Sequence, residues 1–206
     1  SAKDAVGESP NSNERSATPV VSAPVAPVLS TATAGNAQVS LSWSAATGAT
    51  GYKVYYGTVP GVYGTPISVG NITTSTVTGL ANGTTYYFAV TGTNTSGESV
   101  RSNEKSAMPV APPAAPALSA ATAGDKQVTL TWAAATGATG YKVYYGTATG
   151  VYGTPITVGN VTTSTVTGLT TGTTYYFAVS GTNTSGESAR SNEKSAMPQV
   201  VPLPQP

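Results

Sequence analysis

The residues whose chemistry could support catalysis are two glutamates, Glu98 and Glu104, which stand six positions apart. Two carboxylates about 5 to 9.5 Å apart can act as acid and nucleophile, or acid and base, in glycoside hydrolysis. The pair recurs twice in the chain, as Glu187 with Glu193 and as Glu8 with Glu14. Cationic residues, Arg101 and Lys105, lie beside it. A pair that recurs with each repeat and has cations nearby favours exposed ion pairing over catalysis.

Other catalytic chemistry is restricted by composition, because the chain has no cysteine and no histidine. Thiolate nucleophiles, disulfides, cysteine-rich zinc sites and histidine bases are therefore excluded. Asp125 is too isolated to suggest calcium, which needs several converging oxygens. The sequence predicts no catalytic residue, no metal site and no bound cofactor.

Charge and hydropathy limit the partners. Charged residues make up 8% of the chain and the net charge is +1, so no basic patch is available to neutralise nucleic-acid phosphates. The longest apolar runs, residues 86–90 and 175–179, are far shorter than a membrane span. The polar residues are mostly Ser, Thr, Asn and Gly, a neutral composition typical of secreted bacterial proteins. We therefore expect an extracellular or cell-surface location.

The chain contains a tandem repeat. Residues 28–109 align with residues 117–198 at an offset of 89, and fifteen of the aligned positions differ, most by conservative exchanges. Such a repeat predicts two consecutive domains of about 100 residues each. We place them at residues 20–109 and 110–198, with proline-rich linkers at 19–27 and 109–116 and a proline-rich tail at 199–206.

The N-terminal segment resembles the end of a further repeat. Residues 7–9 and 12–17 match residues 97–99 and 102–107. Residues 1–19 are thus interpreted as the last loop and last strand of a preceding repeat. The orphan strand would consist of Asn11, Ser12, Asn13, Glu14, Arg15, Ser16 and Ala17.

The hydrophobic pattern within each repeat has a period of two, which indicates half-buried antiparallel strands. In the first repeat we expect strands at residues 39–43, 52–56, 66–69, 75–78, 85–91 and 102–107, and no helix. Closely spaced short strands predict an all-β sandwich. Alternation places these side chains inside it: Val39, Leu41, Trp43, Tyr52, Val54, Tyr56, Val77, Leu80, Tyr86, Phe88 and Val90.

Three features make the resemblance to a known family specific. A tryptophan, Trp43, closes the second strand, Gly-Tyr-x-Val-x-Tyr forms the third, and Leu80 precedes Tyr86 by six residues. The second repeat carries the same set at Trp132, Tyr141, Val143, Tyr145, Leu169 and Tyr175. The chain resembles tandem fibronectin type III domains of the bacterial secreted type. This resemblance implies two seven-stranded antiparallel, immunoglobulin-like β-sandwiches. It also implies a tyrosine corner, in which a phenol hydroxyl bonds to backbone before its own strand.

Tyrosines on the outer face of the predicted sheet are the candidate binding residues. Tyr55 and Tyr87 should point outward from neighbouring strands, and Tyr144 and Tyr176 repeat them. Exposed aromatic rings could stack on sugar rings or anchor a protein partner. Ordinary cross-strand pairing that stabilises the sheet is the alternative.

The remaining loop motifs indicate no defined site. The loop at residues 94–99 occupies the position where some family members carry Arg-Gly-Asp, and that triplet is absent. Asn-x-Ser/Thr sequons occur at Asn71, Asn82, Asn94, Asn160 and Asn183, which in a threonine-rich chain are expected by chance.

Two functions follow as hypotheses. The first is a non-catalytic structural module or spacer, since near-identical repeats argue against a unique active site. A narrower form of it has the orphan strand pairing with a neighbouring copy of the chain, which would build a head-to-tail filament. The alternative is a carbohydrate-binding or adhesion module of a larger secreted protein. The expected partners are thus other protein chains, copies of itself or a polysaccharide.

Overall fold

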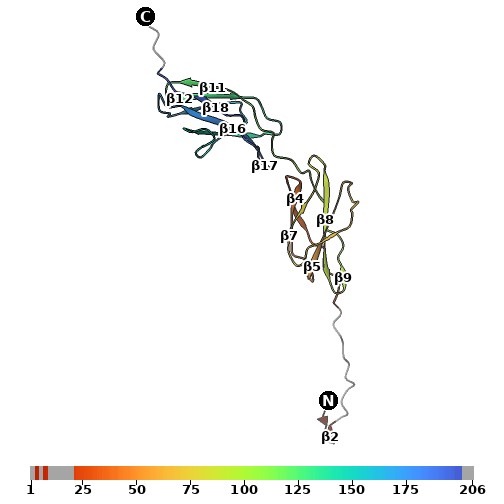
Figure 1. The fold of residues 1–206 in the computed structure, drawn as a ribbon. Coiled ribbons are helices and arrows are strands. Elements are labelled where there is room, and N and C mark those ends of the chain that lie inside the picture. Colours follow the sequence, from red (N-terminus) through yellow and green to blue (C-terminus); the bar gives the residue numbers. More distant parts are fainter. Residues whose placement is uncertain (1–2, 5–6, 9–20, 201–206) are drawn as a thin grey trace.

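The computed structural model describes residues 3–4, 7–8 and 21–200, and these residues form strands, turns and extended segments without a helix. Two β-sandwiches follow one another along the chain and lie end to end (Figure 1). The prediction of two all-β modules is confirmed.

The first sandwich packs a sheet of three strands against a sheet of five. The smaller sheet has the order β3-β4-β7, and the larger runs β10-β8-β5-β6 with β9 also paired to β8. All pairs are antiparallel. The two pieces β9 and β10 make up one interrupted seventh strand. The bounds are β3 Leu29–Gly35, β4 Gln38–Trp43, β5 Gly51–Gly57, β6 Ile67–Ser68, β7 Thr74–Thr78, β8 Tyr86–Asn94, β9 Gly97–Glu98 and β10 Lys105–Ala107.

The second sandwich repeats this arrangement, with sheets β11-β12-β15 and β14-β13-β16 joined by β17 and β18. The strand registers are also repeated, so that Tyr144 lies opposite Ala178 as Tyr55 lies opposite Ala89. The bounds are β11 Leu118–Gly124, β12 Gln127–Trp132, β13 Gly140–Gly146, β14 Ile156–Val158, β15 Thr163–Thr167, β16 Tyr175–Asn183, β17 Gly186–Glu187 and β18 Lys194–Ala196.

The core contains every side chain that alternation placed there. Nine of the eleven are buried, and the remaining two, Tyr56 and Tyr86, are half-buried and pack against them. Leu29 on β3 is a core residue that the pattern did not predict, with only 1% of its surface exposed. Strand β3 was missed as well, because after Leu29 it consists only of Ser, Thr, Ala and Gly.

The last predicted strand is shorter than expected, since residues 102–104 are not part of it. The Ser102 side chain accepts a hydrogen bond from the Val90 amide at 2.9 Å. The Asn103 side chain accepts one from the Leu29 amide and donates one to the Leu29 carbonyl, at 3.0 and 3.1 Å. The Ser102 amide still donates to the Val90 carbonyl at 2.8 Å, but at Asn103 the side chain takes over the pairing and joins the first strand to the last.

Two tyrosine hydroxyls hold loops against the sandwich. The predicted tyrosine corner is present, with the Ala81 amide donating to the Tyr86 hydroxyl at 3.1 Å. A second contact was not predicted: the Ala46 amide donates to the Tyr52 hydroxyl at 2.9 Å. Tyr52 is buried, and its ring centroid lies 5.7 Å from that of Trp43.

The N-terminal strands β1 (Lys3–Asp4) and β2 (Gly7–Glu8) pair with Lys3 opposite Glu8. In the first module, β8 and β9 pair in the equivalent register, with Thr93 opposite Glu98. The described strands thus have the register expected for the last hairpin of a repeat, and the assignment of residues 1–19 to such a repeat stays a prediction. The predicted orphan strand, residues 11–17, lies outside the described residues.

We expect Tyr52→Phe to lower the free energy of unfolding of its module by about 1–3 kcal/mol, because the Ala46 amide loses its partner in a partly buried site. Tyr86→Phe should cost less, since the Ala81 amide lies at an exposed position where water can replace the phenol. The control is Tyr87→Phe, which should change little. Urea unfolding of the segment 21–109 measures all three, and a cost for Tyr52→Phe no larger than for Tyr87→Phe would contradict the assignment.

Candidate functional site

A cluster of charged and phenolic side chains lies on the outer face of the larger sheet of each module. On β5, Tyr52 and Val54 point into the core, so the alternating residues Lys53 and Tyr55 point outward. Lys53 pairs across the sheet with Thr91 on β8, and the β8–β9 hairpin brings Glu98 over the same face.

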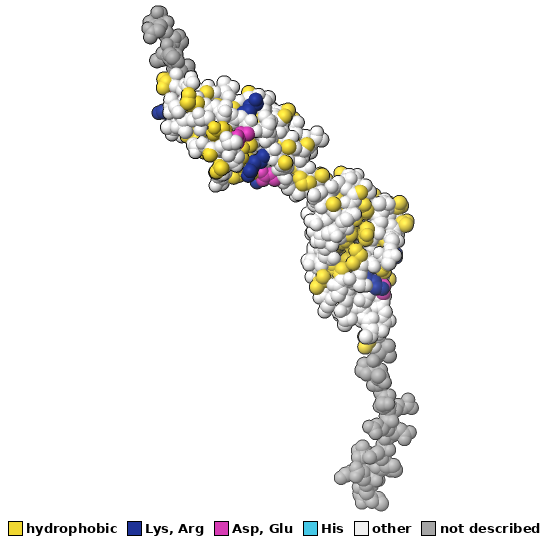
Figure 2. All heavy atoms as spheres, viewed as in Figure 1, with side chains coloured by type: hydrophobic (Ala, Val, Ile, Leu, Met, Phe, Trp, Pro, Cys, Tyr) yellow, Lys and Arg dark blue, Asp and Glu magenta, His cyan; other side chains and the backbone are white. Residues whose placement is uncertain are grey.

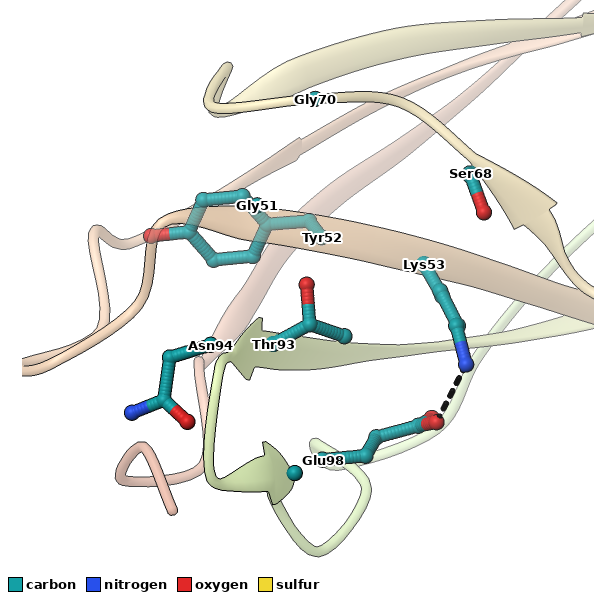
Figure 3. Close-up of a pocket in the computed structure, with 9 residues that line it drawn as sticks. Gly51, Tyr52, Lys53, Ser68, Gly70, Thr93, Asn94 and Glu98 are labelled. Carbon is teal, nitrogen blue, oxygen red and sulfur yellow. Dashed lines mark hydrogen bonds and ion pairs between the residues drawn. The ribbon is translucent and has the colours of Figure 1, made fainter. Parts of the chain in front are cut away.

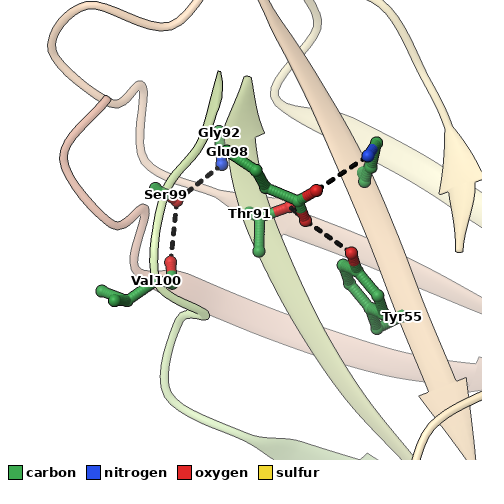
Figure 4. A network of polar contacts seen from close by, with 7 residues as sticks. Tyr55, Thr91, Gly92, Glu98, Ser99 and Val100 are labelled. Atoms are coloured by element: carbon green, nitrogen blue, oxygen red, sulfur yellow. Dashed lines mark hydrogen bonds and ion pairs between the residues drawn. The ribbon is translucent and has the colours of Figure 1, made fainter. Parts of the chain in front are cut away.

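Glu98 is the centre of this cluster (Figure 4). One carboxylate oxygen, Oε2, accepts a hydrogen bond from Lys53 Nζ at 2.7 Å. The other, Oε1, accepts from the Tyr55 hydroxyl at 2.5 Å and from Thr91 Oγ1 at 2.6 Å. Burial raises the pKa of Glu98, but the hydrogen bonds from Lys53, Thr91 and Tyr55 outweigh it and lower the pKa to about 2. Glu98 is therefore ionised at neutral pH and cannot act there as a general acid.

Arg101 covers the two tyrosines of the cluster. Its guanidinium carbon lies 4.8 Å from the ring centroid of Tyr55 and 5.1 Å from that of Tyr63. The two rings meet edge to face with centroids 6.2 Å apart. Such contacts between a cation and an aromatic face are attractive and occupy the surface on which a sugar ring would stack.

Glu104 has a separate role from Glu98. Its Oε2 accepts hydrogen bonds from the Gly61 amide at 2.8 Å and from the Tyr63 hydroxyl at 2.5 Å. It thereby holds the turn that follows β5. Gly57 is required at the base of this turn, because a Cβ there would lie 2.1 Å from the Val62 carbonyl oxygen.

The two glutamates therefore serve different internal contacts rather than one shared site. The ion pairing expected for Glu98 is present, but its partner is Lys53 on β5, on the far side of β8 from β9. Arg101 and Lys105 form no ion pair within the described residues.

The second module reproduces the cluster. Glu187 accepts from Lys142 at 2.7 Å, from Ser180 at 2.5 Å and from Tyr144. Among the fifteen differences between the repeats, the exchange of Thr91 for Ser180 is the one that falls on these hydrogen-bonding groups, and it keeps the hydroxyl. The remaining equivalents are Arg190, Tyr152 and Glu193.

The four predicted tyrosines do lie on the outer face, in two environments. Tyr55 is half-buried and Tyr144 only 7% exposed, and both hydroxyls are bound to glutamate. Tyr87 and Tyr176 are half-buried and lie opposite glycines of the neighbouring strand. Sequence reasoning missed Tyr63 as a neighbour of Tyr55. Tyr63 lies outside a strand, where alternation does not predict which way a side chain points.

A hollow of about 520 Å³ adjoins the cluster in the first module (Figure 3). Its polar lining includes Lys53, Ser68, Thr93 and Glu98. Along one side of this hollow, the charged groups of Lys53 and Glu98 are paired with each other. In the part of the chain that the structure describes, no three His, Cys, Asp or Glu side chains come together as metal ligands.

Charged side chains form small, mixed groups on a largely uncharged surface (Figure 2). On each module, positive and negative side chains lie next to one another, as the ion pairs require. Among the described residues there is no helix that is long and apolar enough to cross a membrane.

The sequons are in different environments. Asn94 and Asn183 use their side-chain nitrogens in two hydrogen bonds each, and Asn82 donates to Asn36. Asn71 and Asn160 are exposed. Attachment of a sugar at Asn94 or Asn183 would remove contacts that the fold uses.

We expect the stability of the modules to be flat from about pH 5 to 9 and to fall on both sides. The folded-state pKa of Glu98 lies below its ordinary 4.5, so its contribution is complete above that value and is lost as pH falls toward 2. Burial and the bond to Glu104 raise the pKa of Tyr63 to about 12, so its contribution is complete below pH 10 and is lost toward 12.

Urea unfolding between pH 2 and 12 measures this profile. The double variant Glu98→Gln/Glu187→Gln should lose much of the acid-side slope, because both carboxylates with lowered pKa are removed. Asp125→Asn, at an exposed turn, is the control and should retain the slope. An unchanged slope in the double variant would contradict the role given to the two carboxylates.

Comparisons with known proteins agree with this fold. A model of the fibronectin type III domain matches residues 22–107 and 111–196. The chain is 37% identical over 118 residues to a Kelch domain-containing protein of Saccharolobus solfataricus, a match that covers 57% of this chain and 16% of that protein. It is 37% identical over 125 residues to Chitinase A1 of Niallia circulans, covering 52% and 17% respectively. The chain thus spans less than a fifth of either relative.

A solved structure extends the comparison. The FN1–FN3 domains of chicken CNTN1 superimpose with a TM-score of 0.66 over 86% of this chain and 69% of that chain. Their sequence identity of 16% shows a shared fold only. With the family model matching both modules, the chain belongs to the fibronectin type III family.

Proposed function

We propose that the chain is a non-catalytic structural spacer within a larger extracellular or cell-surface protein. Fibronectin type III modules are typically non-catalytic accessory domains of such proteins. The observation that carries the proposal is the Glu98 cluster. This group of residues most resembles a functional site, yet in both modules its hydrogen bonds are made to side chains of the same module.

The relatives support this placement. Chitinase A1 is an enzyme by name, and the matching region is a small part of its length. A module that repeats almost unchanged and uses its polar groups for its own cohesion is suited to separating other domains. We propose that this chain separates domains in this way, with the active or binding domains elsewhere in the parent protein.

A carbohydrate-binding function is the alternative. Tyr87 and Tyr176 favour it, because their hydroxyls take part in no hydrogen bond within the described residues and no cation covers their rings. Tyr55 and Tyr144 are less suited, since arginine covers each ring.

Sedimentation with insoluble chitin or cellulose separates the two functions. As a spacer, the chain should remain in the supernatant, and neither Tyr87→Ala/Tyr176→Ala nor Tyr55→Ala/Tyr144→Ala should change this. Retention of the unmodified chain that disappears in the Tyr87/Tyr176 variant would establish the carbohydrate-binding alternative. Circular dichroism confirms that each variant is folded.

The filament form of the structural role remains a proposal. It requires residues 11–17 to pair with a neighbouring copy, and both complete modules already contain their own last strand. If the proposal holds, electron microscopy of the chain should show head-to-tail filaments, and deletion of residues 1–18 should abolish them while both modules stay folded. Monomers at high concentration, or filaments that survive the deletion, would reject it.

A further inference from the structure

The linker between the modules is bound at both of its ends. It runs from the end of β10 at Ala107 to the start of β11 at Leu118. Pro109 and Val110 contact the first module: the Gly83 amide donates to the Pro109 carbonyl at 2.8 Å, and the Val110 amide donates to the Gly35 carbonyl at 3.2 Å. Pro109 is buried.

The next residue of the linker is bound to the second module. Asn183, at the end of β16, donates through Nδ2 to the Ala111 carbonyl at 2.8 Å and to the Gly137 carbonyl at 3.1 Å. Three residues later, the Ala114 amide donates to the Thr136 carbonyl at 3.1 Å. Asn183 therefore joins the linker to two loops of the module that follows it.

Pro113 completes the attachment. It is buried, and a Cβ placed on Gly181 would lie 3.2 Å from the Pro113 Cβ and 3.3 Å from that of Ala138. A glycine at this position of β16 thus leaves the space that the proline ring occupies.

No residue of the linker is left free between the two sets of contacts. The last contact with the first module is made by Val110, and the first with the second module by Ala111. Ala111 precedes Pro112, which restricts its backbone to extended conformations, and Val110 is β-branched. The orientation between the modules is then set by very few torsion angles.

The same contacts occur at the other ends of the modules. Asn94 donates to the carbonyls of Ser22 and Gly48 at 2.7 and 3.0 Å, and Pro24 lies against Gly92. After the second module, the Gly172 amide donates to the Pro198 carbonyl at 2.9 Å and the Gln199 amide to the Gly124 carbonyl at 3.1 Å. One contact differs: Ser96 binds Val21, whereas the Ser185 hydroxyl is buried without a partner in the structure.

We propose that Asn183 is a positioning residue that fixes the orientation between the two modules by fastening the linker to the second module. Asn94 does the same for the segment that precedes the first module. The joint is a property of the repeat, because Asn94 and Asn183 make equivalent contacts in the two modules. It goes beyond the spacer role by making the spacer stiff and defining its direction.

Pulsed electron–electron double resonance, which measures the distance between two spin labels, tests this inference. The chain has no cysteine of its own, so labels attach only at introduced cysteines. Labels at Thr78→Cys and Thr167→Cys, both exposed on equivalent strands, report the distance between the modules. The full chain should give one narrow distance distribution. Asn183→Ala should broaden it roughly twofold, because the backbone torsions of the linker around Ala111 are no longer fixed by the second module.

Two further variants make the result decisive. Asn94→Ala removes the equivalent side chain from the segment before the first module and should leave the distribution narrow. Insertion of two glycines after Ala111 should broaden it at least as much as Asn183→Ala does. The proposal is overturned if the unmodified chain is as broad as the insertion variant, or if Asn183→Ala and Asn94→Ala give the same width. Thermal unfolding of each variant verifies that both modules remain folded.

Discussion

The packing of one sheet against the other supports every other feature of these modules. The chain has no disulfide, and the described residues offer no metal cluster, so the contact between sheets must hold the fold together. Phe88 and Val54 from the larger sheet meet Val39 and Leu41 from the smaller one in a fully buried layer. Losing a side chain the size of Phe88 from such a layer costs about 3–5 kcal/mol, a large part of a small domain's stability. The outer cluster depends on this layer, because burial of Tyr52 and Val54 is what turns Lys53 and Tyr55 outward.

The Glu98 cluster illustrates how a group of residues that resembles an active site can serve cohesion. A carboxylate with three donors at hydrogen-bonding distance has its pKa held far from the range that proton transfer at neutral pH requires. The arginine that could have bound an anionic ligand lies against two aromatic rings. Each polar group therefore has a partner in its own module, and the cluster ties the β8–β9 hairpin and the turn after β5 to the sheet.

Sequence patterns predicted the fold well because strand alternation and core burial are local properties of the chain. The two modules follow from the repeat at an offset of 89 and the core from strand alternation, whereas the tyrosine corner is what the family resemblance implied. The pattern failed where side chains replace backbone contacts, at Asn103, and where a strand lacks large apolar residues, at β3. In the site, it correctly placed the tyrosines on the outer face. It could not reveal that Glu98 pairs with Lys53, 45 positions earlier in the chain, because that contact depends on the hairpin geometry.

The two hydrogen bonds between Asn103 and Leu29 would carry load if the chain were pulled from its ends. The first module is entered near β9 and left near β4, at opposite ends of the sandwich (Figure 1). Tension applied to the chain would therefore load Leu29 and the last strand in opposite directions, so that the Asn103 side chain is sheared rather than peeled. Because two bonds loaded in shear share the force, we expect a higher barrier to forced unfolding than if they were broken one after the other. Asn192 and Leu118 repeat this arrangement, so each module would resist extension at the same point.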